Sequence, residues 1–198
     1  MNRRHLLTTL AALPMLSAPA LLRAQPATMA APASATAAPL PPIAPQFFPT
    51  EVSVRSEFAP GSIIVVSQQF FLYHIIAPRK AVRYGVAVGR AELVFRGQAE
   101  VGRKVEWPSW KPTPEMIARS PARYARYADG MPGGPKNPLG ARALYLYQNG
   151  RDTAIRIHGT TEPESIGHAV SNGCIRMVNE HVMALYDAVP LGTPVMVY

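Results

Sequence analysis

The sequence predicts a mainly β domain, a sandwich or barrel-like sheet structure with two or three short helices. Runs of β-branched and aromatic residues, each of strand length, alternate with short turns from Ile63 onward. Two further runs flank the pair Asn149-Gly150, which is typical of a tight hairpin turn. Near the C-terminus, one stretch repeats its apolar residues at spacings of three and four, as a helix that packs on a sheet does.

Residues 1–24 have the pattern of an export signal. A basic start, Met1–His5, precedes the apolar stretch Leu6–Leu22, and a small residue stands before Gln25. Pro14 and Pro19 interrupt the apolar stretch, so we expect cleavage rather than stable membrane insertion. The predicted destination is the periplasm or cell wall. The paired arginines near the start leave the twin-arginine and the general secretory routes both open.

Residues 25–50 are dominated by Ala and Pro and predict a semi-extended linker, and residues 51–198 predict one folded domain. The 20 Lys and Arg residues of the chain include three in the predicted signal, so 17 remain against 12 acidic residues, a net charge of +5. These basic residues are spread over the predicted strands and loops, which argues against nucleic-acid binding. A weak attraction to anionic wall polymers is the simpler expectation.

The first half of the domain predicts a meander of strands. His74 lies within one of them, and we expect it to be structural or exposed rather than catalytic. Leu93–Trp107 adds one or two more strands. The three runs that predict the meander are 63–66, 70–76 and 81–88.

A short helix is predicted from Thr113, whose side chain can cap it, through Pro114 at the first helical position, and it ends before Pro121. The Gly- and Pro-rich segment 120–140 then predicts a long loop. Either the loop is ordered over the functional site or it is a passive surface loop.

The segments 143–147 and 153–158 predict a hairpin whose turn spans 148–152. Alternation along its second strand puts His158 on a face with Ala154 and Arg156, away from the neighbouring isoleucines. Beyond it we expect a helix capped by Asn179, and then a last strand over 194–198.

Cys174 is the only cysteine, so it cannot form an internal disulfide. His158 lies 16 positions upstream, and Gly173 comes directly before the thiol. These residues fit a nucleophile, a base, and a turn whose backbone N–H groups face the reacting carbon. The alternative is a buried Cys that acts as a small apolar side chain. Spacing and residue type alone leave both readings open.

A metal site is the third alternative, because His158, His168, Cys174 and His181 are potential ligands. The intervening stretches hold nine, five and six residues, whereas structural zinc sites usually place their ligand pairs about two to five residues apart. We therefore expect no metal and no cofactor. His168 is then a loop residue, and His181 an exposed residue in the first turn of a helix.

The segments His158–Thr160 and Ser171–Met177 together resemble the active-site signature of the L,D-transpeptidase catalytic domain family, the cysteine enzymes that cross-link bacterial peptidoglycan. The resemblance covers roughly Val52 to Tyr198. Many members carry a second His directly before the Gly-Cys pair, where this chain has Asn172. Further stretches that resemble the family are 107–114, 133–140 and 192–195.

The resemblance implies that Cys174 attacks a peptidoglycan stem tetrapeptide and expels its terminal D-alanine, with His158 as the base. The resulting thioester passes to a second stem, forming a 3→3 cross-link, to a protein amine such as that of an outer-membrane protein, or to water, as in an L,D-carboxypeptidase. Family members are often acylated by carbapenems. The rival hypothesis is a catalytically silent module that only binds peptidoglycan.

The backbone N–H groups of Cys174, Gly173 and Asn172 are expected to contact the oxyanion, and the Ser171 hydroxyl to hydrogen-bond within this loop. Arg176, two residues past the nucleophile, either binds a substrate carboxylate or braces the loop, and Gly159 is the other expected substrate contact. The resemblance implies that the carbonyl of Gly159 or of the next residue orients the His158 ring. The residues that remain as orienting carboxylates, by elimination only, are Asp187 and Glu180.

Overall fold

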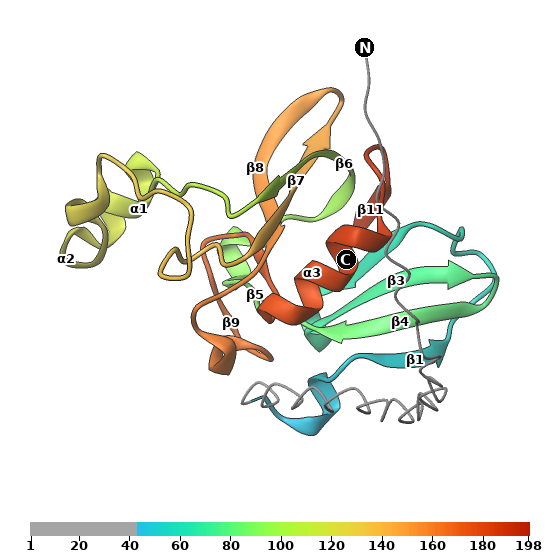
Figure 1. Ribbon diagram of the computed structural model, residues 1–198. Coiled ribbons are helices and arrows are strands. Elements are labelled where there is room, and N and C mark those ends of the chain that lie inside the picture. Colours follow the sequence, from blue (N-terminus) through green and yellow to red (C-terminus); the bar gives the residue numbers. More distant parts are fainter. Residues whose placement is uncertain (1–42) are drawn as a thin grey trace, which may run out of the picture. The chain divides into compact units, whose positions relative to one another are not determined.

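The computed structural model describes residues 43–198. The predicted signal and most of the predicted linker lie outside the described residues. The described part is mainly β, as predicted, with three α-helices (Figure 1). The strands are β1 (Thr50–Ser53), β2 (Ile63–Val66), β3 (Phe71–Ala77), β4 (Lys80–Gly85), β5 (Val88–Gly89), β6 (Gly97–Glu106), β7 (Arg142–Gln148), β8 (Arg151–His158), β9 (Ala169–Ser171), β10 (Ile175–Arg176) and β11 (Pro194–Val197), and the helices are α1 (Pro114–Arg119), α2 (Pro121–Tyr124) and α3 (Asn179–Ala188).

Nine of these strands form one sheet in the order β1-β4-β3-β2-β11-β6-β7-β8-β10. The predicted meander is confirmed, because β2, β3 and β4 pair antiparallel in sequence order. The C-terminal strand β11 then joins the two halves of the sheet, since it lies parallel to β2 and antiparallel to β6. The short strands β5 and β9 pair separately, in parallel.

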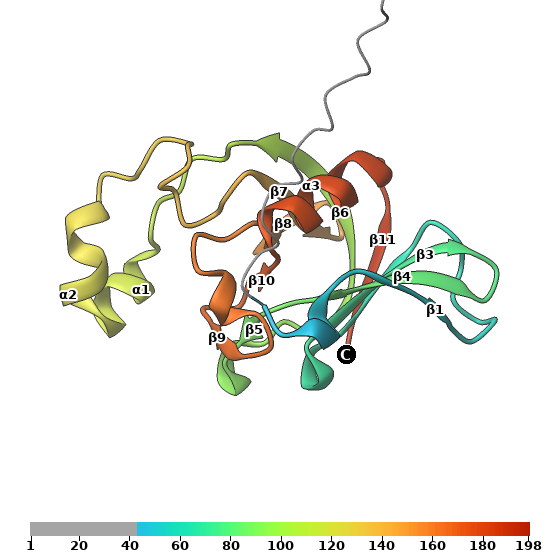
Figure 2. The ribbon, with the colours of Figure 1, turned by 60° about the horizontal axis from the view of Figure 1, so that its bottom comes forward.

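The core lies where α3 packs against β7 and β8. The segment 107–141, which joins β6 to β7 and is called the excursion below, carries α1 and α2, and these two helices stand away from the sheet (Figures 1 and 2). Strand β2 is buried on both faces: Ile63 and Val65 join the main cluster, whereas Ile64 packs with Ile75 and Ala81 in a second one. This two-sided burial explains its unbroken apolar sequence. The fully buried members of the main cluster include Leu72, Val101, Leu144, Leu146, Ile157, Met177, Val182 and Leu185.

The described chain begins within the segment predicted to be a linker. Ile43 and Phe47 pack there against a third buried cluster of Ala87, Ile166 and Val178. Phe47 also packs against Gly85 and Gly167. It lies so close to both that a Cβ added at either glycine would overlap the Phe47 side chain. Some of the chain before the first strand therefore covers the region next to the predicted site.

The predicted hairpin is confirmed, with a tighter turn than the one expected. β7 and β8 are joined by Asn149 and Gly150 alone, and both have positive φ angles, 51° and 73°. Two successive left-handed residues are typical of the turn that matches the twist of paired strands. The last strand, β11, also lies where it was expected.

The helix capped by Thr113 is confirmed, since its Oγ1 accepts a hydrogen bond from the N–H of Met116 at 3.3 Å. The prediction that Asn179 caps α3 was wrong. Asn179 is already the first helical residue, and its side chain points to two other segments, where it is hydrogen-bonded. His181 was also wrongly expected to be exposed: it is 7% exposed and packs between the rings of Phe48 and Tyr84.

Within residues 43–198, no helix is both long and apolar enough to cross a membrane.

Candidate active site

The parallel pairing of β10 with β8 brings the two signature segments together. Ile175 lies opposite Ile157 and Arg176 lies opposite His158, so the residue before β10, Cys174, comes alongside the end of β8. Cys174 and His158 both line one cleft of about 550 Å³. The predicted nucleophile and base, 16 positions apart in sequence, thus face a common space.

His158 is only 4% exposed, and its ring orientation is set by the backbone. Its Nδ1 lies 2.6 Å from the carbonyl oxygen of Gly159. A carbonyl can only accept, so Nδ1 carries the proton and Nε2 is left with a lone pair. Of the two carbonyls expected as orienting groups, the contact confirms that of Gly159. Burial lowers the pKa of His158 to about 4, which keeps the ring neutral at physiological pH.

Cys174 is half-buried, and its thiol lies 3.8 Å from the carbonyl oxygen of Ala154. Burial raises the pKa of Cys174, and a backbone hydrogen bond at Arg156 and the charges of Arg156 and Arg176 only partly oppose this. The free protein therefore holds a neutral thiol and a neutral imidazole. A base that takes the proton during attack is then needed to make the sulfur nucleophilic.

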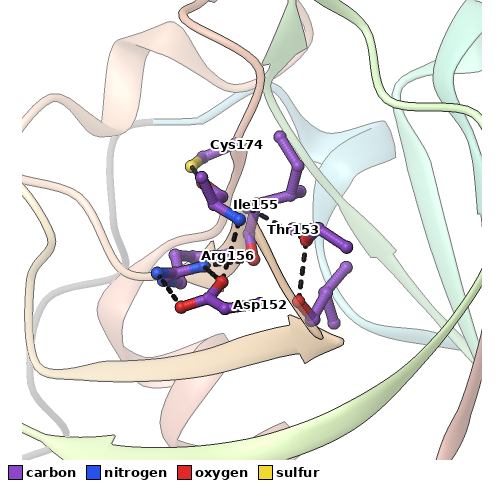
Figure 3. Close-up of polar contacts among 7 residues, drawn as sticks. Asp152, Thr153, Ile155, Arg156 and Cys174 are labelled. Atoms are coloured by element: carbon purple, nitrogen blue, oxygen red, sulfur yellow. Dashed lines mark hydrogen bonds and ion pairs between the residues drawn. The ribbon is translucent and has the colours of Figure 1, made fainter. Parts of the chain in front are cut away.

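A small network on β8 places the carbonyl that faces the thiol. Ala154 has a positive φ of 59°, and its N–H donates to the Asp152 carboxylate at 2.8 Å. The same carboxylate pairs with both terminal nitrogens of Arg156, at 2.6 and 2.8 Å (Figure 3). Arg156 also lies over the ring of Tyr145, 4.0 Å from its centroid. Asp152 thus supports the unusual backbone conformation of Ala154 next to Cys174.

The loop before the thiol is closed by Ser171. Its Oγ donates to the carbonyl of Cys174 at 2.5 Å and accepts from the N–H of Gly173 at 3.2 Å. Gly173 has a φ of 120°, a conformation that other residues rarely adopt. The Gly173 N–H is already engaged, whereas the N–H groups of Cys174 and Asn172 have no hydrogen-bond partner within residues 43–198 and are the available donors of the loop.

Gly159 does not lie on the cleft wall. It is packed against Asn179, whose Oδ1 accepts from the N–H of Ala141 at 3.0 Å and whose Nδ2 donates to the carbonyl of Thr160 at 3.1 Å. A Cβ added at Gly159 would overlap Asn179 Oδ1 and come within 3.0 Å of the Ala141 nitrogen. Gly159 is therefore placed to orient His158 rather than to contact a ligand.

Arg176 lines the cleft, yet it is already engaged in an ion pair. Its Nη1 lies 2.7 Å from the Glu162 carboxylate, whose other oxygen pairs with Arg123 at 3.2 Å. The Arg176 side chain is 15% exposed and the Arg123 side chain 56% exposed. Glu162 thus connects the strand after the thiol to α2, and this contact favours the bracing role for Arg176.

Asn172 makes a second connection to the same excursion. Its Oδ1 accepts from Arg119 at 3.0 Å, and its Nδ2 donates to the hydroxyl of Tyr124 at 3.2 Å. Tyr124 in turn packs edge-on against Trp110, as does Tyr127. Of the two readings for segment 120–140, an ordered element over the site and a passive loop, these contacts support the first.

Replacing Asn172 with Ala is expected to release α1 and α2 from the thiol loop. The hydrogen bonds are partly exposed, so the free energy of unfolding should fall by only about 1 kcal/mol. Amide hydrogen exchange over residues 114–127 should become several-fold faster while exchange in β7 and β8 is unchanged. Arg126→Ala, on the same excursion but without a tie to the thiol loop, is the control. Unchanged exchange in Asn172→Ala would show that the excursion is held by other contacts.

Several residues of the site were not singled out from sequence. Asp152, Glu162 and Arg119 act through side-chain contacts with partners far away in the chain or on a locally distorted strand. The only signal for Asp152 was an acidic residue four positions before Arg156. Of the potential metal ligands, His168 and His181 do not line the cleft. No cluster of ligand residues suited to a metal ion occurs among the described residues.

The fold and site together define a β-sheet domain that presents one buried His and one thiol to a single cleft. The L,D-transpeptidase catalytic domain family matches residues 60–197, most of the chain. The chain therefore belongs to that family, as its signature residues predicted.

Similar proteins agree with this assignment in sequence and in fold. The probable L,D-transpeptidase YbiS of Escherichia coli is 43% identical over 137 residues, which cover 68% of this chain and 43% of that protein. A protein of Fuscovulum blasticum named "Putative L,D-transpeptidase in ATP synthase subunits region ORF 5" is 43% identical over 108 residues, 54% of this chain and 51% of that protein. This chain spans about half the length of the curated relatives it matches.

Two solved structures are informative in different ways. L,D-transpeptidase 3 of Mycobacterium tuberculosis shares the fold at 18% identity, with a TM-score of 0.52 over 69% of this chain and 60% of that one. A protein of Brucella melitensis, named a probable carnitine operon oxidoreductase, is 52% identical, with a TM-score of 0.54 over 76% of this chain and 93% of that one. Its name denotes a chemistry different from that of the family.

Proposed function

We propose that this chain is an exported cysteine L,D-transpeptidase that acts on the stem tetrapeptides of peptidoglycan in the periplasm. The observation that carries the proposal is the hydrogen bond from His158 Nδ1 to the Gly159 carbonyl, because it orients a ring that lines the same cleft as the only thiol of the sequence. It leaves Nε2 as a proton acceptor in a buried ring that stays neutral. Family membership supplies the reaction class.

In the first half-reaction, Cys174 Sγ attacks the carbonyl carbon between the third stem residue and the terminal D-alanine. The thiol proton passes to His158 Nε2, and a tetrahedral intermediate forms. The N–H of Cys174, with that of Asn172, is available to donate to its oxyanion, and one such donor contributes about 2.7–4 kcal/mol. His158 then returns the proton to the leaving nitrogen, D-alanine departs, and a thioester remains on Cys174.

In the second half-reaction, an amine attacks the thioester, and His158 again accepts a proton and returns it to the thiol. A side-chain amine of another stem gives a 3→3 cross-link. A protein amine, such as one on an outer-membrane protein, gives a protein attached to the wall, and water gives a carboxypeptidase. All three outcomes use the same thioester and the same two residues.

The oxidoreductase name of the Brucella melitensis protein suggests a second candidate function, and the architecture argues against it. The described sheet is largely antiparallel, and its parallel pairs are not joined by the strand–helix–strand units that build a dinucleotide-binding fold. One cysteine in the whole chain also rules out a dithiol–disulfide cycle within the molecule.

Acylation by a carbapenem tests the proposal directly. Incubation of the full chain with a carbapenem, followed by intact-mass spectrometry, should show one covalent adduct, and peptide mapping should place it on Cys174. Cys174→Ala and Cys174→Ser are the controls and should stay unmodified. An unmodified wild-type protein would support the rival, a silent peptidoglycan-binding module. Supplying tetrapeptide stems and analysing D-alanine, dimers and tripeptides then identifies the acceptor.

A further inference from the structure

The cleft that holds Cys174 is strongly cationic. Seven Lys or Arg residues line it against one acidic residue, Glu162. The chain without its predicted signal has an excess of only five positive charges, so the cleft concentrates positive charge while other surfaces balance it. A concave site lined by one sign of charge raises the local concentration of oppositely charged ligands.

Three of these cations already have acidic partners. Arg156 is paired with Asp152, and Arg123 and Arg176 share Glu162. The other four have no carboxylate within 4.0 Å anywhere in residues 43–198, and they are Lys111, Arg119, Arg126 and Lys136. All four side chains belong to exposed residues on the excursion that carries α1 and α2.

The acidic residues of the excursion do not cancel this charge within the cleft. Glu115 and Asp129 lie on the same segment, but neither lines the cleft. Of these four cations, Arg119 donates a hydrogen bond to the side-chain amide of Asn172, and this uncharged partner does not neutralise the guanidinium. Lys111, Arg126 and Lys136 thus have no carboxylate partner within residues 43–198, although Arg126 lies over the Tyr127 ring, and they can pair with a ligand that brings carboxylates of its own.

We propose that this cleft prefers donor stem peptides with free side-chain carboxylates to the same peptides in which those carboxylates are converted to carboxamides. Lys111, Arg126 and Lys136 make the distinction. The inference rests on the proposed function, because it assigns a substrate class to the same site. An amide is uncharged and has nearly the shape of a carboxylate, so the two peptides differ in charge and hardly in size. The selection is therefore electrostatic, and salt weakens it.

The test compares two synthetic donors, L-alanyl-γ-D-glutamyl-meso-diaminopimelyl-D-alanine and its counterpart amidated on the glutamyl and diaminopimelyl carboxylates. Release of D-alanine by the full chain should show kcat/KM about tenfold higher for the acidic donor at low salt. The ratio should fall toward one in Lys111→Gln/Arg126→Gln/Lys136→Gln, through loss of activity on the acidic donor alone. Arg79→Gln/Arg96→Gln/Arg151→Gln removes the same charge from exposed residues outside the cleft and should keep the ratio.

A binding measurement separates this inference from the proposed reaction. Cys174→Ala cannot form a thioester, yet the fluorescence of Trp110, which lines the cleft, can report binding of either peptide. Tighter binding of the acidic peptide, lost between about 50 and about 500 mM salt, supports the charge selection even if no D-alanine is released. Equal binding of the two peptides, or tighter binding of the amidated one, overturns it even if both are turned over.

Discussion

Replacing His158 with Gln is expected to slow acylation of Cys174 by about 10²–10⁴-fold, the usual contribution of a positioned general base. Gln can still donate a hydrogen bond to the Gly159 carbonyl, but it cannot accept the thiol proton. The loss should be large because burial raises the pKa of Cys174, so little thiolate forms without a base. Stopped-flow measurement of carbapenem acylation gives the rate, and a variant within about twofold of wild type would assign the base to another residue.

The burial of His158 also makes the stability of the wild-type protein depend on pH, and the His158→Gln variant lacks this contribution. Burial lowers the pKa of His158 from 6.5 to about 4 in the folded protein. Between these two values the unfolded chain binds a proton that the folded chain does not, so stability is complete above pH 6.5 and falls as the pH decreases toward 4. A shift of this size corresponds to about 3 kcal/mol of unfolding free energy.

Urea denaturation at pH 7 and at pH 4 measures this effect. Wild type should lose about 3 kcal/mol more than His158→Gln between the two pH values. His74 and His181 also have pKa values lowered by burial, but both remain in each protein and so cancel in the comparison. Equal losses in the two proteins would mean that His158 is accessible to protons in the folded state.

The strands and the signature were predictable from sequence because their determinants are local. Alternating or continuous apolar runs identified the meander, and two residues, Asn149 and Gly150, were sufficient to place the hairpin. The family resemblance implied that the carbonyl of Gly159 or Thr160 orients the His158 ring, and the acceptor is that of the next residue, Gly159. In each case the interacting groups are neighbours in the chain or belong to one regular pattern.

The remainder of the site depends on contacts between distant segments. Asn179 looked like a helix cap because Asn is common there, yet its side chain bonds Ala141, 38 positions away. Asn172 meets Arg119 across 53 positions, and no local pattern predicts that pair. His181 follows the same logic: it packs between the rings of Phe48, from the segment before the first strand, and Tyr84, from β4.

Replacing Gly159 with Ala is expected to impair folding and catalysis together. The added Cβ would meet Asn179 Oδ1 and the Ala141 nitrogen, so either the backbone at residues 140–141 or the end of β8 must shift. Overpacking of this kind usually costs about 1–3 kcal/mol. Because the Gly159 carbonyl orients His158, even a shift of about 1 Å should slow acylation by up to about 10²-fold.

A double-mutant cycle identifies the obstacle. Asn179→Ala alone should destabilise by about 1–2 kcal/mol, because it removes the acceptor of Ala141 and the donor to Thr160. If Asn179 Oδ1 is what the new methyl group meets, Gly159→Ala should cost less in the Asn179→Ala background, with a coupling of at least about 0.5 kcal/mol. Additive free energies of unfolding would instead place the clash on the Ala141 backbone. Acylation in the double variant then separates the packing role of Gly159 from the role of its carbonyl. Relief of the clash should restore stability. It should restore the acylation rate only if the Gly159 carbonyl returns to within hydrogen-bonding distance of His158.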